Sequence, residues 1–360
     1  MLPRLTLLGV LLLAPFASAE EFKVSYFFDN AKEVMHFVDL AFPSAQRGVA
    51  VGYVTDEVGT KAARGVAVLT ADGGAHWTQL KLDDLPVSLY FLNDSDGWMV
   101  TARGIWKTDE SGRTWKRISK HTQLSILKVW FLDRNHGFAI GPEKTVLETT
   151  DGGIKWTAVK AASQPTGRPE ISSYSEIAFV DAKIGLIVGS AVAPNQRSFN
   201  PAARQVPTLT LQLQTKDGGV TWTPSTAPLF GVVDGLAFTE GEGLALFTYS
   251  NQFEWPSEVY KLDFKNGSST SVFRKKDRRV TDMQKFPERA FLVAVEPPPR
   301  AKNAGSLPGK IHVLSSLDLR EWAEIPVDYR ATGAFPMLAG PDGQHVWMAT
   351  DSGMILRMQQ

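Results

Sequence analysis

The chain contains short stretches of mostly apolar residues, and polar segments rich in turn residues separate each stretch from the next. Three of these stretches are Val49–Tyr53, Phe138–Ile140 and Leu244–Phe247. Short apolar runs between turn residues are typical of buried β-strands. The pattern therefore predicts an all-β protein made of many short strands.

The first 19 residues depart from this pattern. Met1–Arg4 is short and positive, Leu5–Ala14 is mostly apolar, and residues 17–19 are the small residues that precede a cleavage site. The apolar run is shorter than the roughly 20 residues that a membrane-spanning helix needs, and no later stretch is long enough. Residues 1–19 are predicted to be a signal peptide, and residues 20–360 an exported protein in the periplasm or outside the cell.

One unit recurs along the rest of the chain and is complete from Val129 to Val159, VWFLDRNHGFAIGPEKTVLETTDGGIKWTAV. It ends in the octapeptide Thr-x-Asp-Gly-Gly-x-x-Trp. Close copies contain Asp72 and Trp77, Asp151 and Trp156, and Asp217 and Trp222; a weaker copy contains Gly112 and Trp115, and a decayed copy runs from Ser315 to Trp322.

Each octapeptide is predicted to be a β-hairpin turn. Glycine adopts the positive φ angles of a tight connection, and the Asp carboxylate accepts backbone N–H groups across it. The Trp begins the next strand and is large enough to fill the gap between neighbouring sheets. We therefore interpret the box Trp residues as core and the box Asp residues as structural. Stacking of the Trp residues on sugars is the alternative.

Repeats of about 40 to 50 residues with four short strands are typical of propeller blades. Seven first strands are expected near Val34, Ser88, Leu127, Glu176, Val233, Val280 and Gly333. The seventh unit stops after its third strand, Met354–Met358, whereas an additional strand, Phe22–Phe28, precedes the first unit. We predict one seven-bladed β-propeller of four-stranded antiparallel blades over residues 20–360, closed by the N-terminal strand, which completes the last blade.

These motifs resemble the Asp-box or BNR repeats of sialidases, sortilin-type receptors and xyloglucan-cleaving glycosidases. The compact order of Phe131-Leu-Asp133, Gly137 to Gly141 and Thr149 to Trp156 more closely resembles the photosystem II stability and assembly factor-like propellers. That resemblance implies binding of the subunits of a membrane complex, and some members carry a lipid anchor. Glu20 stands where a lipidated Cys would be, so no lipid anchor is expected here.

The composition of the chain argues against several classes of ligand and of catalytic chemistry. Lys and Arg (38) balance Asp and Glu (38), which argues against a uniformly basic surface for nucleic acid. The absence of cysteine excludes disulfides, thiolate metal sites and a Cys nucleophile. The six His residues show no metal-binding spacing, and no glycine-rich phosphate loop follows a strand. No metal or cofactor is expected, and His76 and His136 are predicted to be solvated in turns.

No complete catalytic constellation is found. A sialidase-like enzyme needs converging arginines, a Tyr-Glu nucleophile pair and an acid. Glu258 and Tyr260 lie two apart on a predicted strand and could share a face, but we interpret them as an outer-strand pair.

The long insertions fall mainly in the loops between second and third strands and between blades, which emerge on one face of a propeller. Loops held by a rigid scaffold often carry function, and Arg with aromatic residues favours protein interfaces. The candidate binding residues on this face are Arg64, Arg103, Arg168, Arg197, Phe199, Arg204, Phe253, Trp255, Arg300 and Lys302, beside the basic run Arg274 to Arg279. The opposite face is expected to be acidic.

The leading hypothesis is a monomeric, non-enzymatic propeller that binds a protein or peptide segment in the cell envelope, as an assembly-factor-like scaffold. The alternative is a glycan-active enzyme or a lectin that uses the same face. A third hypothesis is a structural envelope protein without a discrete ligand.

Overall fold

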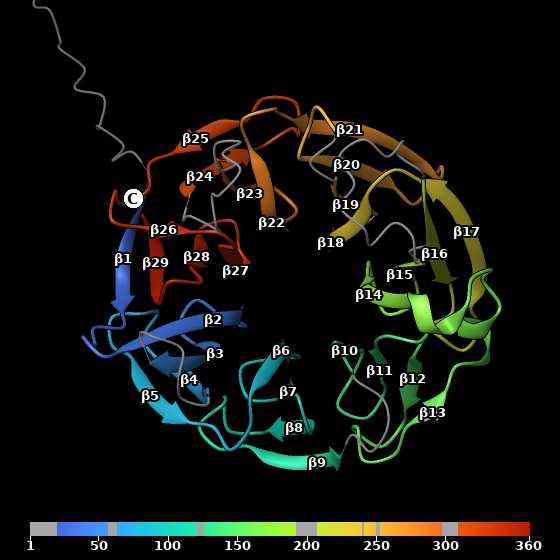
Figure 1. The fold of residues 1–360 in the computed structure, drawn as a ribbon, viewed down its shortest axis with the longest axis horizontal. Helices are drawn as coiled ribbons and strands as arrows, with labels where there is room; N and C mark the ends of the chain where they lie inside the picture. The colour runs from blue at the N-terminus through green and yellow to red at the C-terminus, as the bar shows by residue number, and fades with distance from the viewer. Residues whose placement is uncertain are drawn as a thin grey trace, which may run out of the picture.

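The computed structural model describes residues 20–56, 63–120, 126–191, 207–239, 241–249, 253–296 and 309–360. Within these ranges the strands form seven antiparallel sheets, which surround a central axis as a ring (Figure 1). Each sheet is one blade. This architecture confirms the predicted seven-bladed β-propeller.

The first four blades each take four consecutive strands, and the first strand of each lies innermost. Blade one contains β2 (Glu33–Ala41), β3 (Gly48–Asp56), β4 (Arg64–Thr70) and β5 (Thr78–Lys81). Blade two contains β6 (Pro86–Phe91), β7 (Gly97–Thr101), β8 (Gly104–Thr108) and β9 (Lys116–Lys120). Blade three contains β10 (Lys128–Phe131), β11 (Gly137–Ile140), β12 (Val146–Thr149) and β13 (Thr157–Ala158). Blade four follows two short 3₁₀ turns, η1 (Lys160–Ser163) and η2 (Pro169–Ile171), and contains β14 (Ser172–Phe179), β15 (Gly185–Ala191), β16 (Thr208–Thr215) and β17 (Thr223–Leu229).

The last three blades include the closure of the ring. Blade five contains β18 (Val232–Thr239), β19 (Glu242–Thr248), β20 (Ser257–Asp263) and β21 (Ser268–Arg274). Blade six contains β22 (Arg279–Lys285), β23 (Ala290–Val295), β24 (Gly309–Ser316) and β25 (Ala323–Ile325), and β26 (Thr332–Gly333) pairs with β24. Blade seven contains β27 (Met337–Asp342), β28 (His345–Ala349), β29 (Met354–Gln359) and β1 (Glu21–Phe27).

The ring closes between the two ends of the chain. Strand β1 pairs antiparallel with β29, from Glu21 opposite Gln359 to Phe27 opposite Met354. The pairing covers the third strand of blade seven, which would otherwise be an open sheet edge. This confirms that the N-terminal strand completes the last blade.

Aromatic contacts between blades explain why the repeat conserves its spacing of Phe and Gly. The ring of Phe131 in blade three stacks on Trp98 of blade two at 3.7 Å, and Phe42 of blade one stacks on Trp347 of blade seven at the same distance. The box Trp156 meets Phe131 edge to face. The large aromatic residues therefore take part in the packing between sheets, together with the aliphatic side chains of the strands.

Two details differ from the sequence-based expectation. The first strand of blade seven begins at Met337 and not near Gly333, because Thr332 and Gly333 pair with Lys310 and Gly309 of blade six. The decayed box of blade six is shifted by one residue: the Ser316 hydroxyl accepts the N–H of Leu319, and Leu319 itself has a φ of 61°. The box is one residue shorter there, and Leu319 has the left-handed conformation that glycine adopts in the other copies.

Candidate interaction face

Strand direction divides the loops between the two ends of the ring. In an antiparallel blade, the connection from second to third strand and the connection to the next blade emerge at the same end. We call this end the loop face. The other end carries the turn from first to second strand and the Asp-box turn between third and fourth strands, and we call it the box face.

The Asp boxes form compact hydrogen-bonded turns. In blade one, Thr70 Oγ1 accepts the N–H of Gly74 at 2.8 Å and donates to Asp72 at 2.9 Å. Asp72 accepts the N–H and contacts the ring of His76, and these bonds hold the pKa of its carboxyl well below its usual value. The indole N–H of Trp77 donates to the carbonyl of Gly74. Blades three and four repeat the Thr-to-Asp and Thr-to-Gly bonds. The box carboxylates thus order the turns.

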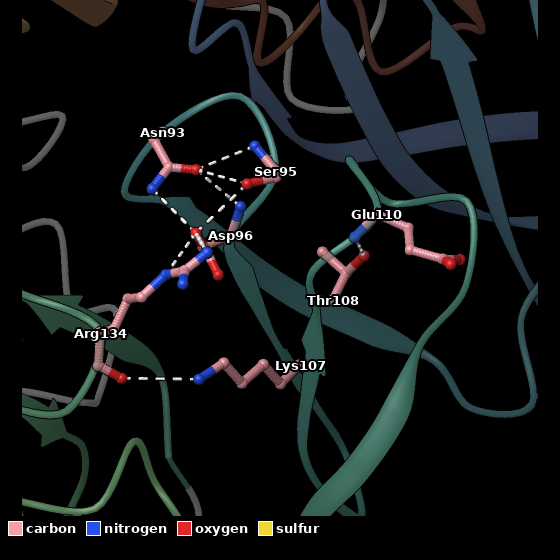
Figure 2. A network of polar contacts seen from close by, with 7 residues as sticks. All are labelled: Asn93, Ser95, Asp96, Lys107, Thr108, Glu110 and Arg134. Carbon is pink, nitrogen blue, oxygen red and sulfur yellow. Dashed lines mark hydrogen bonds and ion pairs between the residues drawn. The ribbon is translucent and has the colours of Figure 1, made fainter.

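One acidic residue on the box face pairs with an arginine of the next blade. Figure 2 shows Asp96 at the end of the turn before β7, where it accepts hydrogen bonds from Arg134 of the next blade at 2.7 and 2.9 Å and from Asn93 at 2.9 Å. Burial alone would raise the pKa of Asp96, but these bonds lower it below its usual value. Beside this network lies an open cavity of about 480 Å³ whose lining mixes both charges: Arg47, Asp94, Ser95, Asp109, Glu110, Ser111 and Arg113. Both charges therefore occur in this part of the box face.

Two of the candidate arginines on the loop face are held by carboxylates. Arg64 donates to Glu33 at 2.7 Å. Arg103 donates through Nε to Asp84 at 3.0 Å and through Nη2 to the carbonyl of Asp83 at 2.8 Å. The exposed side chain of Arg168, in contrast, has no hydrogen-bond or ion-pair partner among the described residues. The remaining candidates Arg197, Phe199, Arg204, Arg300 and Lys302 lie outside the described residues.

Phe253 and Trp255 belong to a cluster on blade five. Phe253 packs against Tyr249 with 4.9 Å between ring centroids, and against Phe230 at 5.4 Å. The guanidinium of Arg274 lies 4.7 Å from the centroid of the Trp255 ring, and the ammonium of Lys276 lies 5.2 Å from it. Lys276 also pairs with Glu254 of the same loop. We call these residues the blade-five patch: Phe230, Tyr249, Phe253, Trp255, Arg274 and Lys276.

The patch is built from three loop-face connections. Phe230 lies between β17 and β18, Tyr249, Phe253 and Trp255 lie between β19 and β20, and Lys276 follows β21. Phe230 is 45% exposed and lies next to Phe253, so the two rings form part of one aromatic surface. Further along the same connection, the guanidinium of Arg279 lies 4.8 Å from the ring of Phe335, which is also exposed. Aromatic surface and positive charge therefore occur together at this side of the loop face.

A buried carboxylate lies beneath the patch. Glu258 is 4% exposed and accepts hydrogen bonds from the hydroxyls of Tyr249 at 2.9 Å and Ser271 at 2.6 Å. The guanidinium of Arg274, opposite Glu258 in the strand register, lies 3.5 Å from the same carboxylate. Burial, followed by the contact with Glu258, raises the pKa values of Tyr249 and Tyr260 above their usual range. Glu258 and Tyr260 do share a face, but on β20, two strands outward from the innermost strand β18.

A second group of charges lies on the innermost strands. Lys128 of β10 donates to both carboxylate oxygens of Glu176 of β14, at 2.7 and 2.8 Å. Asp39 and Asp282, each directly after a β-bulge, accept the N–H of Leu89 and Leu338 of the next blade, both at 2.7 Å. Burial raises the pKa of Asp282 to about 7, against the opposing effect of its hydrogen bonds and Lys128. No set of three His, Asp or Glu side chains in the described ranges is placed to hold a metal ion.

Sequence reasoning identified part of the blade-five patch. It singled out Phe253, Trp255 and the run from Arg274 to Arg279, but missed Phe230, Tyr249 and the burial of Glu258. Tyr249 could have been found, because it lies in the same insertion as Phe253. No sequence signal links Phe230 to them, because it lies on a different connection. His136 also differs from expectation, because its ring contacts Glu148 at 2.9 Å and is only a quarter exposed.

Comparisons with known proteins point to one group. Residues 113–193 match the family model described as photosynthesis system II assembly factor YCF48. A photosystem II assembly lipoprotein Ycf48 from Synechococcus sp. (strain CC9902) is 44% identical over 46 residues, which are 13% of this chain and 14% of that protein. The Ycf48 protein of Thermosynechococcus vestitus is 43% identical over 42 residues, 12% of each chain. These alignments cover only a small part of the length of the curated relatives.

Solved structures extend the likeness to the whole ring. YCF48 bound to D1 peptide superposes with a TM-score of 0.61 at 16% identity, over 96% of this chain and 99% of that one. YCF48 from Cyanidioschyzon merolae gives 0.59 at 15% identity, over 95% and 99%. A GH74 xyloglucanase from Xanthomonas campestris gives 0.58 at 13% identity, over 94% of this chain and 53% of that one. The chain is a propeller like the photosystem II assembly factors in its repeats and in its fold.

No helix within the described ranges has the length and apolar character that crossing a membrane requires.

Proposed function

We propose that this protein is a non-enzymatic binding propeller that holds a protein or an exposed peptide segment on its loop face, with the blade-five patch as the contact region. The observation that carries the proposal is the arrangement of Trp255 with two cations, Arg274 and Lys276, near its ring. Trp and Arg are the residues most often found at the energetic centres of protein interfaces. The rigid strands of blade five fix the ends of the loops that carry these residues, which limits the backbone ordering cost of binding.

The similar propellers support the same type of partner. One of them is described as YCF48 bound to D1 peptide, so a ring of this shape accommodates a peptide. The family model matches residues 113–193, which belong to the repeated scaffold of blades two to four, so the identity of the partner does not follow from that match. We propose a polypeptide partner, whose preferred sequence is to be determined by selection from a peptide library.

We further propose that the protein acts outside the cytoplasm, because residues 1–19 have the pattern of a signal peptide. We also propose that it acts as a monomer. Several similar proteins are described as lipoproteins. This sequence contains no cysteine, so a lipid joined through a cysteine thioether cannot form on it. Fractionation of cells that express the full chain, with mass spectrometry of the processed N-terminus, tests this proposal. Cytoplasmic protein that retains residues 1–19 would contradict it.

Binding is tested with two probes, a D1 peptide and peptides selected from a phage-displayed random library against the purified protein. The double variant Phe253→Ala, Trp255→Ala should weaken binding of the selected peptides by more than tenfold, as loss of interface anchors does. Tyr329→Ala is the matched control, because Tyr329 is 91% exposed and lies outside the patch.

Equal affinity of the wild type and the double variant would contradict the assignment of the patch. Failure to select any peptide would contradict a polypeptide partner. Hydrolysis of a fluorogenic sialoside or of xyloglucan by the purified protein would overturn the non-enzymatic assignment and favour the glycan-active alternative.

A further inference from the structure

The blade-five patch consists of two groups of side chains, which we call the aromatic arm and the cationic arm. The aromatic arm runs from Phe230 through Phe253 to Tyr249. The cationic arm consists of Trp255 with Arg274 and Lys276. Side chains on loops carry considerable rotamer freedom, so a binding surface made from them needs something that fixes their positions.

Glu258 contacts both arms. Its Oε2 accepts the hydroxyl of Tyr249 at 2.9 Å, which fixes the end of the aromatic arm. Its Oε1 lies 3.5 Å from Nη1 of Arg274, the guanidinium that covers Trp255. Ser271 donates to the same oxygen at 2.6 Å. A single carboxylate on β20 therefore joins the aromatic arm to the cationic arm.

The location of Glu258 makes this role specific. The carboxylate is nearly inaccessible, with 6% of the side chain exposed, so it lies beneath the surface where a partner would contact the patch. Arg274 is 48% exposed and so presents part of its guanidinium to solvent while the rest contacts Glu258. A buried ion pair stabilises weakly on balance, because desolvation offsets most of the attraction, but it can determine which conformation a surface adopts.

We infer that Glu258 is the positioning residue of the patch: it orders Tyr249 and Arg274 for partner binding without touching the partner. This inference rests on the proposed function. It predicts that removing the charge of Glu258 weakens binding even though the variant keeps every side chain of the exposed surface.

The test uses the full chain and the tightest peptide from the library selection, with affinity measured by calorimetry and folding by thermal unfolding. Glu258→Gln should bind the peptide about tenfold more weakly than the wild type. Tyr249→Phe, which removes only one hydroxyl and keeps the ring, should weaken binding by a smaller factor. Glu242→Gln is the matched control, because Glu242 lies on β19 of the same blade, at the box-face end, and pairs with Lys285 at 3.2 Å. It should bind as the wild type does.

A double-mutant cycle separates positioning from a general structural role. If Glu258 acts through Tyr249 and Arg274, then Glu258→Gln should cause no further loss of affinity in the background Tyr249→Phe, Arg274→Gln. A full additional tenfold loss in that background would overturn the inference. The inference would also be overturned if Glu258→Gln bound the peptide with wild-type affinity while the double variant Phe253→Ala, Trp255→Ala had lost binding. If the double variant itself binds normally, the proposed function fails.

Discussion

Arg289 donates two parallel hydrogen bonds to Glu20, from Nη1 to Oε1 at 2.7 Å and from Nη2 to Oε2 at 2.5 Å. Arg289 lies in the turn between β22 and β23 of blade six, whereas Glu20 directly precedes β1 of blade seven. The bidentate pair thus ties the beginning of the ring-closing strand to the neighbouring blade. Its geometry is the strongest that an Arg–carboxylate pair forms.

Loss of this pair should weaken the closure. Glu20→Gln leaves Arg289, which is 11% exposed, without its charge partner and should lower the free energy of unfolding by about 1–3 kcal/mol. Arg289 holds the pKa of Glu20 below its usual value, chiefly by hydrogen bonding. The stabilisation is therefore present above the ordinary pKa of Glu and is lost as the pH falls through the lowered value. Urea unfolding at pH 7 measures the change.

The control for this prediction is Glu21→Gln. Glu21 pairs with Lys23 at 2.5 Å, but both side chains are at least 42% exposed, and such surface pairs contribute little. An equal effect of the two substitutions would show that Glu20 has no special part in closing the ring.

The fold was predictable because its signals are local and repeated. The hydrogen bonds of Asp72, Asp151 and Asp217 all lie within five residues of each Asp. The seventh unit has no fourth strand of its own, so its third strand, β29, was the expected partner of β1. The blade-five patch was only partly predictable, because Phe230 meets Phe253 across two connections of different blades. Burial of His312 between Glu296 and Glu324 was equally hidden, since His312 lies on β24, Glu324 on β25 and Glu296 directly after β23, and the three residues form no sequence motif.

Glycines of the Asp boxes should tolerate substitution poorly. Gly219 has a φ of 92°, and a Cβ there would lie 2.2 Å from Cζ of Phe138, a fully buried ring. Gly219→Ala should therefore lower stability by about 3 kcal/mol or more, from strain and overpacking together. Gly267→Ala separates the two effects, because Gly267 has a φ of 69° with no atom near its Cβ position. Only about 1–2 kcal/mol is expected there. Equal losses at both sites would argue against packing as the cause.

The innermost strands should make stability fall as the pH rises. Burial raises the pKa of Asp282 to about 7 in the folded protein, above its ordinary value of 3.8. The folded state then holds a proton that the unfolded chain has released, so the stabilisation is complete below pH 3.8 and is lost as the pH rises through 7. Asp282 alone would lower the unfolding free energy by up to about 2 kcal/mol between pH 5.5 and pH 8.

Thermal unfolding of Asp282→Asn against the wild type tests this pH dependence. The variant cannot titrate at this position, so its midpoint should change less between pH 5.5 and pH 8 than that of the wild type. Burial also raises the pKa values of Asp39 and Glu176, so part of the dependence should remain. Identical pH profiles for the two proteins would contradict the assignment to Asp282.

The pair of Asp84 and Arg103 should respond unequally to substitution. The Asp84 side chain is 4% exposed and also accepts the hydroxyl of Thr101 at 2.7 Å, whereas the Arg103 side chain is 67% exposed. Burial would raise the pKa of Asp84, but its hydrogen bonds lower it overall. Asp84→Ala should cost about 2–4 kcal/mol, because it leaves buried donors unpaired. Arg103→Ala should cost about 1 kcal/mol or less, because solvent screens its attraction to Asp84.

Urea unfolding of both variants measures this difference. Arg168→Ala is the control, because the Arg168 side chain is exposed and has no partner in the described part of the chain. This substitution should change stability by about 0.5 kcal/mol at most. Arg103→Ala then becomes a clean probe of binding, because it removes a loop-face cation without unfolding blade two. If Arg103→Ala destabilises as much as Asp84→Ala, Arg103 is a structural residue of blade two and is no longer a candidate binding residue.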